Sequence, residues 1–184
     1  MNSGLIILGV ALGICLLYFL IVYNNLIKLN NQVKEAFATM DVYLKKRWDL
    51  IPNIVETVKG YAKHEKETFE KIVSIRSGEY DNLSQDEKLK TNKEINEGIS
   101  KLMALAEAYP DLKANESFLN LSNELTEIED EIAQSRKYFN AVVRIYNNKV
   151  EMFPSNIIAK LTGYKTKEMF MASAAEREVV KVDL

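Results

Sequence analysis

Acidic and basic side chains alternate at a spacing of four residues in the stretch from residue 41 to residue 49. Asp41 and Lys45 are four residues apart, as are Lys45 and Asp49. Residues at this spacing lie on one face of a helix, where opposite charges attract each other. The spacing therefore predicts a ladder of ion pairs along one helical face.

An arginine and an asparagine flank the proline that follows. Arg47 and Asn53 lie on either side of Pro52, and a proline inside a helix leaves a backbone carbonyl without its usual hydrogen bond. Two interpretations are open. The charged and amide side chains can stabilise a kink and pair with neighbouring helices, which the spacing favours, or they can form a polar interaction surface. The candidate interaction surface consists of Asp41, Lys45, Arg47, Asp49, Asn53 and His64.

The single histidine and the single cysteine offer little chemistry. His64 lies among lysines and glutamates, which is typical of an exposed position. A di-metal site in a helical bundle needs paired Glu-x-x-His motifs, and Tyr61 stands three residues before His64. Cys15 lies inside an apolar run, away from any base. Phosphate loops and the common hydrolase and metalloprotease motifs are absent from the sequence. We therefore expect no catalytic residue, no cofactor and no metal site.

The composition argues against two classes of protein. Acidic and basic residues are nearly balanced, 26 against 24, whereas a nucleic-acid-binding protein normally carries a basic excess. A hydrophobic content of 47% argues against disorder. Glycine (7) and proline (3) are scarce, which favours helix over strand. We expect a helical protein with no nucleic acid among its partners.

The N-terminal part of the chain carries an uncharged apolar run from Leu5 to Val22. In a helix this run is about 27 Å long, close to the hydrocarbon thickness of a bilayer. A cleaved signal peptide needs a basic start and a cleavage site with small residues, and the sequence shows neither. The run therefore predicts an uncleaved transmembrane helix, with the lipid bilayer as a partner.

The charges around this run indicate an orientation. Neither Lys nor Arg precedes the run, whereas Lys28 and Lys34 follow it. Positive charges favour the cytoplasmic side, so we expect a single-pass protein of the cell membrane with its N-terminus outside and its helical domain in the cytoplasm. Gly9 and Gly13 share a helix face, and such a pair lets two membrane helices approach closely. The pair indicates a homo-oligomer, or simply reflects the frequency of glycine in membrane helices.

Apolar residues recur about every 3.6 positions from Val33 to Ala62, which is the period of a straight helix. The pattern keeps its phase through Pro52. We therefore expect a kink there, or a break that restarts on the same face, rather than a loop. Asp49 could cap such a restarted helix. The pattern ends near Gly78.

Three later helices are expected over residues 84–108, from 115 or 117 to 153, and over 155–162. Ser84 and Glu87 have the spacing of a capping box at the start of the first. In the second, the inward positions alternate in spacing between three and four from Phe118 to Phe153. Gly163 ends the third.

Together these elements predict an all-α protein in which a single N-terminal transmembrane helix continues, without a linker, into an elongated antiparallel helical bundle. The apolar patterns are more often a core than a cofactor pocket. A further turn or helix is expected from Lys165. The expected parts are a short outer end (1–4), the transmembrane helix (5–23), the bundle domain (24–164) and a C-terminal tail (165–184).

Several motifs carry a family resemblance. The most specific is the run from Asp41 to Tyr61, Asp-Val-x-Leu-Lys-x-Arg-x-Asp-Leu-Ile-Pro-Asn-Ile-Val-Glu-Thr-Val-Lys-Gly-Tyr. Further matching stretches are Tyr109–Ala114, Arg136–Asn140, Phe153-Pro154 and Gly163-Tyr164. In these stretches the sequence resembles the LemA family, and the resemblance extends over nearly the whole chain.

The resemblance implies a cell-membrane protein with one N-terminal span and a cytoplasmic helical bundle, and it implies no reaction. Our leading hypothesis is a membrane-anchored, non-enzymatic scaffold or interaction protein of the cell envelope, with an unknown protein partner and unassigned biochemical activity. The alternative is an adaptor or sensory module that signals through the helix leaving the membrane, with Pro52 as the switch. A third hypothesis is an enzyme with a site near Arg47, Asp49 and His64.

Overall fold

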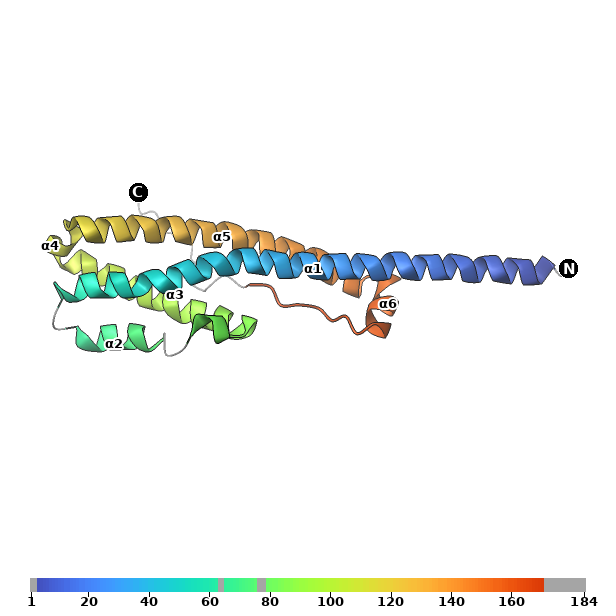
Figure 1. Cartoon of the computed structure of the whole chain (residues 1–184), viewed down its shortest axis with the longest axis horizontal. Helices are drawn as coiled ribbons and strands as arrows, with labels where there is room; N and C mark the ends of the chain where they lie inside the picture. The colour runs from blue at the N-terminus through green and yellow to red at the C-terminus, as the bar shows by residue number, and fades with distance from the viewer. Residues whose placement is uncertain (1–2, 63–64, 76–78, 171–184) are drawn as a thin grey trace, which may run out of the picture. The chain divides into compact units, whose positions relative to one another are not determined.

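The structure is a computed structural model that describes residues 3–62, 65–75 and 79–170. Over these residues the chain is helical and contains no strand, which confirms the predicted all-α fold. The elements are α1 (Ser3–Lys59), α2 (Lys66–Ser74), the short 3-10 helix η1 (Tyr80–Asn82), α3 (Gln85–Ala108), α4 (Pro110–Lys113), α5 (Glu116–Glu151) and α6 (Ser155–Leu161) (Figure 1).

Helix α1 runs from the apolar N-terminal part of the chain into the packed part without a break, and Pro52 lies inside it. Of the kink and the break that the sequence leaves open at Pro52, the break does not occur, so Asp49 caps no restarted helix. The helix continues because the side chains around the proline hold its phase. Ile51, Ile54 and Val55 are buried on its core-facing side, and their packing offsets the hydrogen bond that proline removes.

The chain divides into two compact units. The terminal unit consists of residues 3–39 and 136–169, and the central unit consists of residues 40–135 and Phe170. Helices α1 and α5 each contribute one part to each unit.

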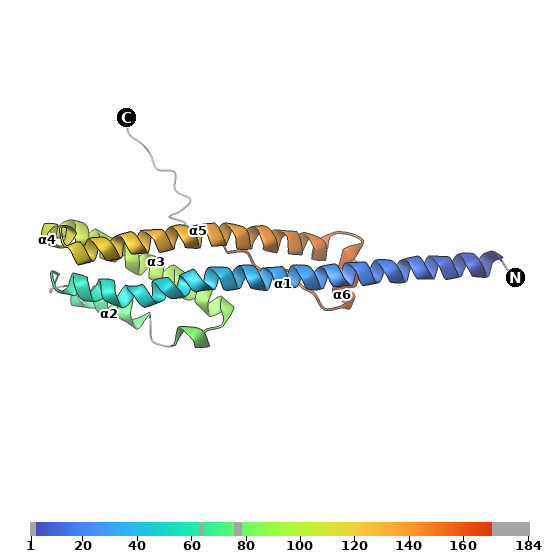
Figure 2. The same cartoon turned by 45° about the horizontal axis from the view of Figure 1, so that its top comes forward.

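In the terminal unit, α1 and α5 run in opposite directions and α6 folds back beside α1, as Figures 1 and 2 both show. Phe37 meets the edge of Phe139 with ring centroids 6.0 Å apart. Farther along, Ile158 and Ala159 of α6 share a buried cluster with two α1 residues. These α1 residues are Val22 and Leu26.

The apolar run of α1 contrasts with these packed parts. Its large side chains from Leu5 to Leu17 are all more than half exposed, and α1 is the one helix within the described ranges that is long and apolar enough to cross a membrane. Gly9 and Gly13 are open as well, with no heavy atom within 4 Å of an added Cβ. Their role as a dimer face stays a prediction.

In the central unit, α1 contacts α3 and α5 through Arg47, and the predicted apolar pattern of α1 is buried along both units. Phe37, which belongs to the terminal unit, is half-buried. The other positions of the pattern are buried: Val33, Met40, Leu44, Trp48, Ile51, Val55, Val58 and Ala62. Helix α2 adds Phe69 and Ile72 to this core. It approaches α3 closely at Gly98, where an added Cβ would lie 3.2 Å from Ile72.

Caps fix where the later helices begin. Ser84 and Glu87 form the predicted capping box: the Glu87 backbone N–H donates to Ser84 Oγ, and the Ser84 N–H donates to Glu87 Oε2 at 2.8 Å. Hydrogen bonds from Ser84 lower the pKa of Glu87. Asn115, rather than Ser117, caps α5, because its Oδ1 accepts the Phe118 N–H at 3.0 Å.

One prediction near the C-terminal end of the chain is wrong, and the turn or helix expected from Lys165 is absent as far as Phe170. Phe153, expected to close the inward pattern of the long helix, is 78% exposed, because α5 ends at Glu151 and Phe153 lies in the turn that follows. Gly163 ends α6 as predicted, with φ at +77°. The chain then runs on without a helix from Tyr164 to Phe170, held by hydrogen bonds to Tyr146 and Asn147. Residues 171–184 lie outside the described part of the chain.

Candidate functional site

Arg47 lies at the centre of the central unit, where it is 1% exposed. Its Nη1 donates to Asn96 Oδ1 at 2.7 Å and to Glu129 Oε1 at 2.5 Å, and its Nη2 donates to Asn92 Oδ1. Arg47 comes from α1, the two asparagines from α3 and the glutamate from α5. One guanidinium therefore joins three helices.

The surroundings of Arg47 make it a structural cation. A buried charge is costly unless it is paired and hydrogen-bonded. Glu129 supplies the counter-charge, and its side chain is 38% exposed. The two amide oxygens complete the shell, while Nε has no hydrogen-bond partner. Because three of its five N–H donors are hydrogen-bonded and its side chain is buried, Arg47 offers no exposed group to a substrate.

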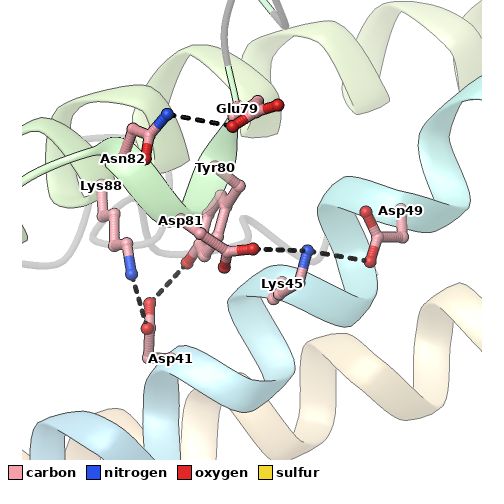
Figure 3. A network of polar contacts seen from close by, with 8 residues as sticks. All are labelled: Asp41, Lys45, Asp49, Glu79, Tyr80, Asp81, Asn82 and Lys88. Atoms are coloured by element: carbon pink, nitrogen blue, oxygen red, sulfur yellow. Dashed lines mark hydrogen bonds and ion pairs between the residues drawn. The ribbon is translucent and has the colours of Figure 1, made fainter.

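A second polar network joins α1 to η1 and the start of α3 (Figure 3). Asp41 accepts a hydrogen bond from the Tyr80 hydroxyl at 2.6 Å and one from Lys88 Nζ at 2.7 Å. Lys45 lies between two carboxylates, 3.4 Å from Asp49 and 3.8 Å from Asp81. The Lys45–Asp49 half of the expected ladder is present, whereas Asp41 contacts side chains of other elements.

Tyr80 is the buried member of this network. Its ring lies 5.4 Å from the ring of Trp48, and Lys88 Nζ lies 4.6 Å above it. Burial, reinforced by the hydrogen bond to Asp41 and by its charge, raises the pKa of Tyr80 well above the ordinary tyrosine value. Ionisation is disfavoured because it would place a second negative charge beside Asp41.

Asp49 also lines, together with Asn53, an open groove of about 900 Å³. The groove lies in the central unit between α1 and the first half of α5. Its lining residues are Tyr43, Lys46, Asp49, Leu50, Asn53, Glu124, Glu127, Ile128, Asp130, Glu131 and Gln134. Five of these carry a carboxylate and one carries an amine, so we name it the acidic groove.

A carboxylate of the acidic groove shifts the pKa of a tyrosine in the same groove. The charge of Glu131, followed by burial and a hydrogen bond to the same carboxylate, raises the pKa of Tyr43. Lys46 Nζ lies 5.5 Å above the Tyr43 ring. Within the described part of the chain, no three carboxylate, histidine or cysteine side chains converge as a metal ion would require.

The structure does not bring the six predicted surface residues to one place. Arg47 is in the core, and Asp41 and Lys45 face η1 and α3. Asp49 and Asn53 line the acidic groove. His64 lies outside the described residues. Arg47 and Asp49, which the enzyme hypothesis placed together, point to different faces of α1.

Sequence reasoning missed the partners of these residues, chiefly Asn92, Asn96 and Glu129. One signal could have found two of them. Asn92 is in phase with the buried residues Ile95 and Leu102 of α3, and an amide at a core position calls for a polar partner. Asn96 follows it one turn later.

Comparison with known proteins places the chain among relatives. A family model described as the LemA family matches residues 36–184. The chain is 29% identical over 175 residues to protein LemA of Metamycoplasma hominis, a match that covers 93% of this chain and 80% of that protein. It is 34% identical over 77 residues to magnetosome protein MamQ 2 of Paramagnetospirillum magneticum, covering 42% of this chain and 28% of the relative. It is 33% identical over 72 residues to magnetosome protein MamQ of Magnetospirillum gryphiswaldense, covering 39% and 26%. With the family model matched over most of its length, the chain belongs to the LemA family.

Proposed function

We propose that this protein is a membrane-anchored, non-enzymatic scaffold or interaction protein of the cell envelope. The observation that carries the proposal is the division of α1. Its large side chains from Leu5 to Leu17 are exposed, while its later turns carry a row of buried side chains in both units. Exposing a helix that is apolar on all sides to water is unfavourable. The bilayer supplies the missing contact.

Charge and family support the proposal. Lys28 and Lys34 follow the apolar run, which favours a cytoplasmic helical domain and an N-terminus outside. The family model and the names of the relatives, LemA and the magnetosome protein MamQ, indicate no catalytic family. Arg47, the most deeply buried charge among the described residues, serves the fold.

The anchor is tested by extraction of membranes at alkaline pH, which leaves spanning proteins behind. We expect the natural protein to stay in the membrane. Leu12→Arg combined with Leu16→Arg should release it, because each charge at the centre of a span costs about 3 kcal/mol. A matched control places the same charges at the exposed apolar positions Val42 and Leu119 and should stay bound. Release of the natural protein would contradict the anchor.

The interaction role is tested at the acidic groove, because two of the predicted surface residues line it. A photo-crosslinking amino acid is placed at Asn53 or Glu127 in the intact protein in its own membrane. Val42, exposed on α1 but outside the groove, is the control position. A discrete adduct from the groove positions and none from Val42 supports the role. Equal adducts from all three positions, or none, contradict it.

The second candidate function is a sensory or adaptor module. The observation that favours it is the unbroken course of α1 from the apolar run through Pro52 to Lys59, which would transmit motion directly. Spin labels at Val42→Cys and Glu56→Cys, with Cys15→Ser, lie about 21 Å apart in a helix. If Pro52 acts as a switch, the natural protein should show two distances between the labels, and the Pro52→Ala variant should show only one. A single distance in both proteins would remove this candidate.

A further inference from the structure

Four large apolar side chains lie exposed on the turn between α5 and α6 and along α6. They are Met152, Phe153, Ile157 and Leu161, with exposed fractions of 62, 78, 53 and 75%. Ile157 and Leu161 are four residues apart on one face of α6, and Met152 and Phe153 lie in the turn that leads into it. We name these four residues the α6 patch. A soluble protein rarely leaves such side chains together in water.

The opposite face of α6 packs against α1, and this contact determines beside which residues of α1 the α6 patch lies. Ile158 and Ala159 are buried against Val22 and Leu26, and Phe19 and Tyr23 pack against the same cluster. Val22 is the last residue of the apolar run. Figure 2 shows α6 beside α1, near the end of α5. The patch therefore lies level with the end of the run.

This height places the patch at the surface of any bilayer that surrounds the run. The helix from Leu5 to Val22 is about 27 Å long, against about 30 Å of hydrocarbon. The apolar layer therefore ends near Val22, where α6 packs. A short apolar face at this level enters the headgroup and acyl boundary, about 5–10 Å deep.

The charges around the patch are those of a lipid-facing surface. Lys149 and Lys160 flank it on α5 and α6, and Lys165 follows α6. Glu151 is the acid that lies next to it in the chain. An apolar centre with a basic rim suits anionic headgroups.

We propose that the α6 patch inserts into the interface of the bilayer beside the end of the transmembrane helix, so that the chain holds the membrane at two places. The inference rests on the proposed membrane anchor. The second contact would fix the rotation of α1 about its own axis, and hence which face of the terminal unit is turned to the membrane.

The test uses the full chain in vesicles of phosphatidylcholine and phosphatidylglycerol in equal parts. A polarity-sensitive fluorophore is attached at Ile157→Cys in a Cys15→Ser background. Nitroxide lipids labelled near the headgroup quench it if it enters the interface. Tyr138→Cys is the matched control, since Tyr138 is also 53% exposed in the terminal unit but lies on α5, away from the patch. We expect quenching at position 157 to be several-fold stronger than at position 138.

A separate label on the natural Cys15 distinguishes the two proposals. Cys15 lies within the exposed run, so nitroxides deep in the acyl chains should quench its label if the helix spans. Quenching at Cys15 with equal, weak quenching at 157 and 138 overturns the α6 inference and leaves the anchor intact. Absence of quenching at Cys15 overturns the anchor and the inference together.

Two further results are decisive. A label at 157 that is shielded from aqueous iodide but not quenched by lipid nitroxides would mean that protein covers the patch, and the inference would be wrong. Phe153→Ser with Leu161→Ser should reduce lipid quenching at 157 by at least half. The fold should persist, because both side chains are exposed. Unchanged quenching in a folded double variant would also overturn the proposal.

Discussion

At the scale of single residues, the guanidinium of Arg47 is the polar centre of the central unit. Arg47→Met removes the donor to Asn92, Asn96 and Glu129 and leaves the two amide oxygens unsatisfied. We expect the free energy of unfolding to fall by about 3 kcal/mol, measured by chemical denaturation of the full chain in detergent. Arg144→Met, on an exposed position of α5, should change it by less than about 0.5 kcal/mol. Equal effects of the two variants would contradict the structural role of Arg47.

Tyr80 should make the stability of the central unit depend on pH in the alkaline range. Burial and Asp41 raise the pKa of Tyr80 in the folded state, whereas in the unfolded chain it is about 10. Its contribution to stability is therefore present below pH about 10 and is lost as the pH rises above that value. We expect stability to fall less steeply between pH 9 and 11, the range bracketing about 10, in Tyr80→Phe than in the natural protein. Identical slopes would show that Tyr80 is accessible and ionises freely.

At the scale of elements, the capping box of α3 is a local interaction, and the sequence alone predicts it. Ser84→Ala removes the hydroxyl that accepts the Glu87 N–H, so we expect a loss of about 1 kcal/mol in the free energy of unfolding. Ser100→Ala, in the exposed middle of the same helix, should be neutral or slightly stabilising, since alanine has the higher helix propensity. A loss of the same size from both variants would mean that the box contributes nothing specific.

The elements also show how far sequence reasoning reaches. Periodicity and caps predict the helices, because both depend on neighbours within one or two turns. The exposure of Phe153 was missed, since an apolar residue in phase with a pattern is indistinguishable from one just past the helix end. The partners of Arg47 were missed because they depend on the register between α1, α3 and α5. The separation of Asp49 from Arg47 follows from their angular positions on α1, but which helix each one faces is decided by packing.

At the scale of the whole molecule, the charges after the apolar run should set the orientation in the membrane. In a Cys15→Ser background we expect Ser3→Cys to react with an impermeant maleimide in intact cells. Asn120→Cys, exposed on α5, should react only after the membrane is opened. The reason is the cost of carrying Lys28, Lys34 and the charged domain across the bilayer.

The same charges supply the control for this orientation. Lys28→Gln with Lys34→Gln, combined with Asn2→Lys and Ser3→Lys, moves the positive charge to the other end of the run. A fraction of the molecules should then invert, with the label at position 120 reacting in intact cells. If position 120 of the unaltered chain reacts before the membrane is opened, the helical domain lies outside. Any protein that binds the acidic groove would then be extracellular or periplasmic.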